Sequence, residues 1–418
     1  MKRIVSVLMI LLLLSSVGCS TDKPSPASYP DSAAVEPVEL RFDVSKIEGY
    51  DDFVCTLSAA LLDGKDNRNF SPISAYYALA MAAEGANGQT LSDLLNLLGC
   101  ESLDALHTST GDMTTKLSRK TETGEIALCN SLWMSDVFPL SESYRNRLAE
   151  RYQAEAETVP FGTAAAGKRI AGWIADKTNG LITPAPEAMQ FDALTLAVLL
   201  NTVYFRDQWV WRFYESENEP GTFTCANGTE TDVDFMHRLL KDAYVYRGDG
   251  FLRFSLPFEG RGYMTFVLPD EGIALDTLLG TPEKLRALLE SGERMDADVD
   301  LLLPKYSISD QFELSDVLCS LGLTDAFTNN ADFSGMSDMQ PRLDRVFQET
   351  VLELNELGVE AAAYTEVAIA PGAAAPWEAE PTPLPLIEFH LDRPFLFILY
   401  AGSIPLFIGT VTAQTNAE

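Results

Sequence analysis

The stretch NELGVEAAAYTEVAIAPGAAAP, residues 355–376, is unusual for a globular protein, because almost every side chain in it is small. Every second residue from position 359 to position 369 is apolar or small, and the interleaved positions include two glutamates and a tyrosine. This period of two is the pattern of a strand with one buried face. Three consecutive alanines at 361–363 nevertheless stand near its start, although alanine is a poor strand former and favours helix. The segment therefore combines a strand pattern with residues that strands do not favour.

On both sides of this stretch, apolar runs rich in strand-forming residues predict further strands. These runs occupy residues 126–135, 194–209, 250–258, 262–270, 298–309 and 395–413. Within the last run, AGSIP at 401–405 predicts a hairpin turn.

Helical patterns predominate in the first half of the chain. Residues 71–86 predict an apolar helix with Ser71 as its N-cap and Pro72 at its first position. Further helices are expected at 90–99 and 168–182, both of which include glycine stop signals. Helices gathered early and strands gathered late predict an α+β fold with large antiparallel sheets.

The N-terminus carries a targeting pattern. Two basic residues at 2–3 precede an apolar run at 4–14, which is too short to span a bilayer and fits a secretory signal. The following SSVGC, residues 15–19, resembles a bacterial lipoprotein box. We therefore expect a signal peptide at 1–18 and a lipidated Cys19, with ordinary signal cleavage nearby as the alternative.

Residues 19–40 are rich in Pro, Ser and Ala, which predicts a flexible tether ahead of one large domain at 41–418. With the signal and the lipid, the chain is expected to be secreted and anchored to the outer face of a bacterial membrane. The membrane contact would be through the lipid alone.

Charge and motif content exclude several classes of function. The formal net charge of −31 over 418 residues argues against nucleic-acid binding and against electrostatic attraction to anionic lipid. The three histidines, His107, His237 and His390, form no metal-spacing pair, and no Gly-x-Ser-x-Gly or phosphate-binding motif occurs. The five cysteines after Cys19 match neither a zinc site nor a disulfide scaffold, so they are expected to be small buried side chains. The sequence thus predicts no enzyme, no cofactor and no metal.

Several segments together resemble the serpin family, in the family's order and across essentially all of residues 41–418. They are NFSPISAYYALAMAAEGANGQT, TNGLI, LLNTVYFRDQWVWRF, LLLPKYSIS, LGLTDAFTNNADFSGMSD, LELNELGVEAAAYTE, DRPFLFILY and PLFIGTV. The resemblance implies helices plus three β-sheets, with a large, mainly antiparallel central sheet. It also implies an exposed reactive-centre loop, here at about 356–388, and a monomeric inhibitor that traps a protease in a covalent complex.

In this family, the cleaved loop inserts into the central sheet as a new strand, which explains the alanine-rich pattern. Bulky side chains would clash with the strands between which the loop inserts, and overpacking costs about 1–3 kcal/mol per site. Residues 358–370 contain no proline and no inward-facing charge, so the chain is expected to be competent to insert. A surface helix or linker of Ala and Glu is the alternative. The expected hinge residues are Glu356, Gly358, Val359, Glu360, Ala361, Ala362 and Ala363.

The resemblance also implies roles for residues around the opening of the sheet. Lys305 matches the partner of Glu356 in a charge pair at the loop base, and Trp209 matches a tryptophan at the top of the sheet. The complete implied set for the sheet-opening region is Ser71, Ser74, Asn201, Gln348, Trp209 and Lys305.

The family spacing places the reactive bond at Gly372–Ala373, although a proline-rich insertion after the hinge leaves Ile369, Ala370 and Ala374 as candidates. The bait contains no Lys or Arg, so its partner is expected to be an elastase-like or subtilisin-like serine protease. The alternatives are a papain-like cysteine protease as the target, and a non-inhibitory cell-surface binding protein.

Overall fold

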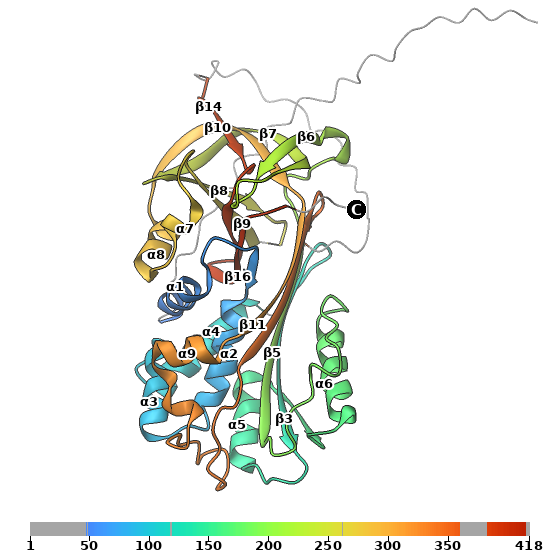
Figure 1. Cartoon of the computed structure of the whole chain (residues 1–418), viewed down its shortest axis with the longest axis vertical. Coiled ribbons are helices and arrows are strands. Elements are labelled where there is room, and N and C mark those ends of the chain that lie inside the picture. Colours follow the sequence, from blue (N-terminus) through green and yellow to red (C-terminus); the bar gives the residue numbers. More distant parts are fainter. Residues whose placement is uncertain (1–46, 48, 118, 261, 360–382, 415–418) are drawn as a thin grey trace, which may run out of the picture. The chain divides into compact units, whose positions relative to one another are not determined.

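The computed structural model describes residues 47, 49–117, 119–260, 262–359 and 383–414, and all of these belong to one compact unit (Figure 1). The expected signal peptide, Cys19 and most of the reactive-centre loop lie outside the described residues.

Nine α-helices lie in the described residues. They are α1 (Tyr50–Leu61), α2 (Pro72–Ala83), α3 (Gly88–Leu97), α4 (Leu103–Leu117), α5 (Glu142–Tyr152), α6 (Ala164–Lys177), α7 (Leu275–Leu278), α8 (Pro282–Glu290) and α9 (Ser315–Leu318). The start of α2 is confirmed, because the Ser71 hydroxyl accepts a hydrogen bond from the Ser74 N–H and Pro72 follows the cap. None of these helices is both long and apolar enough to cross a bilayer.

The central sheet has seven described strands in the order β11-β12-β13-β5-β3-β2, with β4 paired to β3. Their bounds are β2 (Arg119–Lys120), β3 (Glu125–Ser135), β4 (Glu155–Val159), β5 (Ala197–Gln208), β11 (Tyr306–Glu313), β12 (Phe347–Asn355) and β13 (Gly358–Val359). All of the ladders are antiparallel except β3–β4.

A second sheet has nine described strands in the order β1-β16-β15-β9-β8-β7-β10-β14, with β6 paired to β7. Their bounds are β1 (Arg68–Phe70), β6 (Glu219–Thr224), β7 (Glu230–Gly248), β8 (Phe251–Pro257), β9 (Gly262–Pro269), β10 (Glu293–Pro304), β14 (Leu386–His390), β15 (Phe395–Ala401) and β16 (Ile404–Val411). The 19-residue β7 pairs with β6 and β10 and, at its C-terminal end, with β8. Two groups of strands therefore join into one sheet through β7.

The α+β class is confirmed, but the expected order of elements is wrong in part. Strands β3 and β5 lie where strands were expected, at 126–135 and 194–209, but the short strands β1, β2 and β4 in the first half and the helices α7, α8 and α9 in the second half were not expected. The sequence does contain a start signal for α8, because Thr281 caps the helix and Pro282 opens it. The expected strand at 298–309 divides at Lys305 into β10 and β11, which belong to different sheets. The hairpin at AGSIP is confirmed between β15 and β16.

Two helices pack on opposite faces of the central sheet, α2 on one face and α6 on the other (Figure 1). Residues of β5 divide between them, because Leu199 packs in the core cluster that contains α2, whereas Val198 and Leu200 pack in the cluster of α6. This arrangement explains why the 194–209 run is apolar at consecutive positions.

Candidate functional site

The central sheet is divided between β5 and β12. Among the described residues, the two strands are joined only through β13, in which Val359 pairs with Leu354 of β12 and with Asp207 of β5. Below this two-residue bridge, no described ladder connects the strands. The edges of β5 and β12 therefore flank a slot, which is the name used below for the gap that continues downward from β13.

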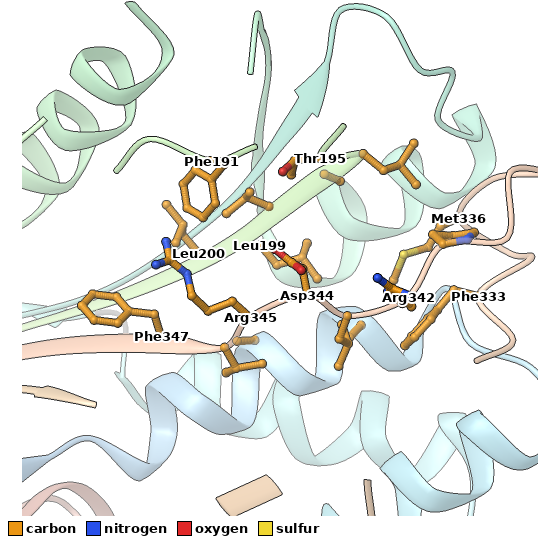
Figure 2. A pocket seen from close by; sticks show the side chains of 18 of the residues that line it. Phe191, Thr195, Leu199, Leu200, Phe333, Met336, Arg342, Asp344, Arg345 and Phe347 are labelled. Atoms are coloured by element: carbon orange, nitrogen blue, oxygen red, sulfur yellow. The ribbon is translucent and has the colours of Figure 1, made fainter. Parts of the chain in front are cut away.

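Two cavities continue the slot below β13. The upper one, of about 50 Å³, is lined by residues of β5, β12 and α6 that include Asn201, Thr202 and Gln348. The lower one, of about 560 Å³, lies between the start of β5, the start of β12 and α2 (Figure 2). Its walls are largely apolar, with Leu199 and Leu200 on the β5 side. Facing strand edges of this kind can accept an added strand between them.

At the top of the slot, the backbone requires glycine at position 358. The φ angle of Gly358 is 153°, and a Cβ on this residue would lie 2.1 Å from the carbonyl oxygen of Asp207. The next residue, Val359, is only 3% exposed. The chain that follows β12 therefore already pairs with β12 and β5 at Gly358 and Val359, which belong to the predicted hinge.

The base of the hinge is held by side-chain contacts to Glu356. Its carboxylate accepts hydrogen bonds from Lys305 Nζ at 2.9 Å and from Asn218 Nδ2 at 2.9 Å. The nearby Trp209 is 1% exposed and donates its indole N–H to the carbonyl of Asn355 at 3.0 Å. Lys305 and Trp209, two positions implied by the resemblance, thus both contact the segment that leads into β13.

These contacts shift the pKa of the Glu356 carboxyl. Burial favours the neutral acid, but hydrogen bonds from Asn218 and Lys305 outweigh it, so the pKa lies below its ordinary value of 4.5. A carboxyl whose pKa is lower in the folded state stabilises the fold above its unfolded pKa, and this contribution is lost as the pH falls through the folded pKa.

We expect Glu356→Gln to lower the stability of the uncut protein by about 1 kcal/mol at pH 7, the scale of a partly exposed pair. Melting curves of parent and variant should differ at pH 7 and converge as the pH falls below about 4.5. A constant difference across this range would mean that the charge of Glu356 does not hold the hinge. Glu353→Gln, at an exposed β12 position, is the matched control.

In the middle of the slot, two serines at the start of α2 each contact a different edge, Ser71 that of β12 and Ser74 that of β5. Ser71 exchanges two main-chain hydrogen bonds with the side-chain amide of Gln348 on β12, at 2.9 and 2.8 Å. Ser74 Oγ donates to the carbonyl of Asn201 on β5 at 3.2 Å. The Asn201 amide donates to Asn130 Oδ1, while its own Oδ1 is buried without a hydrogen-bond partner among the described residues. The structure thus brings together Ser71, Ser74, Asn201 and Gln348, as the resemblance implies, and leaves one acceptor unused.

The three histidines contact carboxylate side chains. His107 contacts Glu84 at 2.5 Å, and His237 and His390 both contact the carboxylate of Asp300, at 2.8 and 3.4 Å. The described residues contain no group of three or more His, Cys, Asp or Glu side chains that could hold a metal. All five cysteines after Cys19 carry free thiols, and Cys55, Cys100 and Cys225 are buried as expected; Cys129 and Cys319 are half-buried.

Several expected site residues lie outside the described residues. They are Glu360, Ala361, Ala362, Ala363, Ile369, Ala370, Gly372, Ala373 and Ala374. In the other direction, sequence reasoning missed several residues that line the lower cavity, among them Phe191, Arg345 and Phe347. The only sequence signal for the two phenylalanines was their aromatic character, which many core positions share, and Arg345 carried no such signal.

Comparison with known proteins identifies relatives along most of the chain. The family model described as Serpin (serine protease inhibitor) matches residues 48–414. Serpin-Z1C of Triticum aestivum is 31% identical over 382 residues, which cover 85% of this chain and 92% of that protein. A protein of Thermococcus kodakarensis described as an uncharacterized serpin-like protein is 31% identical over 440 residues, covering 98% of each chain.

Solved structures agree in fold. The native state of Tengpin, described as a thermophilic serpin, has a TM-score of 0.75 at 28% identity, covering 89% of this chain and 95% of that chain. The latent state of the same protein has a TM-score of 0.73 at 25% identity, covering 88% and 98%. A complex of thyroxine-binding globulin with thyroxine has a TM-score of 0.73 at 24% identity, covering 88% and 99%, and shows the common fold alone.

Proposed function

The chain belongs to the serpin family, whose members are in general protease inhibitors rather than enzymes, and we propose that it is a suicide inhibitor of an extracellular elastase-like or subtilisin-like serine protease. The protease cleaves the reactive-centre loop and is held as an acyl-enzyme. The loop then enters the slot between β5 and β12 and carries the bound protease with it.

The observation that carries the proposal is the slot, which opens directly below the residues that precede the loop. Val359 lies opposite Leu354 and Asp207, and each further residue along an inserted strand moves its partners one position down each edge. Thr365 would accordingly lie level with Gln348 and Asn201, where its hydroxyl can donate to the unused Asn201 Oδ1.

The same register supports insertion of the apolar face toward the core. Leu354 and Leu352 of β12 are each 2% exposed, and Gln348 contacts Ser71 at the start of α2. These even-numbered positions share one face of β12, and their partners on the incoming strand are the odd-numbered positions from 359 to 365. Those positions hold Val, Ala, Ala and Thr, whose small side chains fit without displacing the core.

The length of the slot favours Gly372–Ala373 as the reactive bond. In this register, the first residue of β5, Ala197, is the partner of position 369, and the lower cavity continues beyond it to Thr195 and Leu194. Cleavage after Ile369 or Ala370 would leave this end of the cavity unfilled. Cleavage after Gly372 provides enough chain to fill it.

Incubation with an elastase-like protease is the test. We expect a complex that resists SDS, together with a released fragment of residues 373–418 whose N-terminus is read by mass spectrometry. A trypsin-like enzyme is the control and should form no complex through the loop, since residues 360–390 contain no Lys or Arg. Cleavage of the loop without a complex would instead favour a non-inhibitory binding protein, and a complex with a papain-like enzyme alone would change the target class.

The location of the protein is part of the same proposal and is supported by the signal-like sequence before Cys19. The assay can be repeated on cells that express the full chain. The complex should fractionate with membranes in the parent and be released in Cys19→Ala. If the complex is released from membranes in the parent as well as in Cys19→Ala, the lipid anchor is wrong, and the proposed inhibitory mechanism is not affected.

A further inference from the structure

Arg345 lies at the lower end of the slot between two aromatic rings. Its guanidinium carbon is 5.1 Å from the ring centroid of Phe191 and 5.7 Å from that of Phe347. Figure 2 shows the arginine side chain between the two phenylalanines, beside Leu200. Both distances lie within the range of cation–π attraction.

The two rings belong to opposite sides of the slot. Phe347 is the first residue of β12, whereas Phe191 lies in the segment that leads from α6 into β5. Phe191 and Phe347 both pack against the apolar cluster of α6, which also includes Leu200 of β5. The guanidinium therefore links the start of β12 to the segment that leads from α6 into β5.

The rings are the principal partners of this cation. Arg345 is exposed and forms no ion pair within 4.0 Å in the part of the chain that the structure describes, although the protein carries a net charge of −31. A neighbouring arginine behaves differently, because Arg342 donates to Asn329 Oδ1 at 2.8 Å. The stacked position of Arg345 is thus not a consequence of a carboxylate nearby.

We propose that Phe191, Arg345 and Phe347 form a clamp across the slot that stabilises the uncut protein and has to open before the last part of the loop can insert. The inference rests on the proposed function, because it assigns Arg345 as a positioning residue for loop insertion. Arg345 lies two residues before the start of β12 and three positions before Gln348, so the upper slot can fill while the clamp is closed. Insertion then has an early part above the clamp and a late part that requires it to open.

Arg345→Gln is the test, with melting temperature measured before and after cleavage of the loop. The uncut variant should melt a few degrees below the uncut parent, whereas the cut variant and cut parent should melt together, since the clamp is open in both. The step that traps the protease should become about three- to tenfold faster, on the scale of one or two exposed cation–π contacts. The clamp proposal is wrong if Arg345→Gln destabilises the uncut and the cut protein equally, or if it destabilises neither form.

Matched variants separate the clamp from a general effect on the fold. Arg345→Lys keeps the charge and should retain part of the stabilisation, while Arg342→Gln should leave the difference between uncut and cut forms as in the parent. Phe191→Leu combined with Arg345→Gln should show coupling in the uncut protein only. Additive effects in the uncut protein would contradict the proposal.

The clamp and the proposed function fail in different ways. If the cut and uncut parent melt at the same temperature, the loop does not insert and the inhibitory mechanism is wrong. The coupling between Phe191 and Arg345 in the uncut protein still tests the clamp in that case. If the loop inserts and the coupling is absent, only the clamp is wrong.

Discussion

A single cut in the loop after Gly372 is expected to raise the melting temperature of the protein by about 10 °C or more. In the uncut state, Gly358 and Val359 are the only described residues that bridge the facing edges of β5 and β12. An inserted strand would pair with both edges, and each net hydrogen bond contributes about 1 kcal/mol. It would also fill the cavity of about 560 Å³ beside Leu199.

The gain is partly offset because ordering each residue costs about 1–2 kcal/mol. A net gain of about 5 kcal/mol is enough for the expected rise, since about 2 °C per kcal/mol applies to large domains. Differential scanning calorimetry of the cut and uncut forms is the measurement. If both forms melt at the same temperature, the slot is not a site for the loop and the inhibitory mechanism has to be abandoned.

The substitution Val359→Arg is expected to convert the inhibitor into a substrate. Val359 is 3% exposed and already pairs with Leu354 and Asp207 in the uncut protein, so an arginine there would either be buried at the top of the slot or displace β13, and in both cases it would obstruct the strand that has to extend from this residue. The neighbouring Asp207 carboxylate is itself buried, and its Oδ1 already accepts hydrogen bonds from the N–H groups of Gln208 and Gly260. Removing the arginine charge from water costs several kcal/mol, which pairing with a buried carboxylate offsets only in part, and 1.4 kcal/mol corresponds to a factor of ten.

The number of inhibitor molecules cleaved for each protease trapped should therefore rise at least tenfold. The rate of loop cleavage should change by less than about threefold, because the scissile bond is thirteen residues away from position 359 in the proposed assignment. Glu360→Arg is the matched control: its alternation places it on the opposite face of the strand, and it should inhibit like the parent. The cut Val359→Arg protein should also lack the rise in melting temperature, which links the two experiments. Unchanged inhibition by Val359→Arg would show that the pairing of Val359 between β12 and β5 is not needed for the rest of the loop to insert.

Local features of the fold could be predicted because their causes lie within a few residues. Ser71 and Pro72 set the start of α2 through a cap and a fixed φ angle. Period-two alternation from Val359 onward predicted which residues face the core, and the burial of Val359 agrees with it. Eight ordered segments pointed to the family, which the match over residues 48–414 confirms. The later helices α7, α8 and α9 were missed because two of them span a single turn and carry little periodic signal.

The division of the central sheet could be established only from the tertiary structure. The slot exists because β5 and β12, which lie more than a hundred residues apart in the chain, face each other and, in the part of the chain that the structure describes, are bridged only by Gly358 and Val359. The unused acceptor on Asn201 and the position of Arg345 between Phe191 and Phe347 depend on the same arrangement. Alternation along residues 359–369 fixes which face of that segment can be buried. The slot that would receive the segment lies between the edges of β5 and β12, and the distance between these edges depends on how α2 and α6 pack against the sheet. That packing is a property of distant contacts, and no local pattern encodes it.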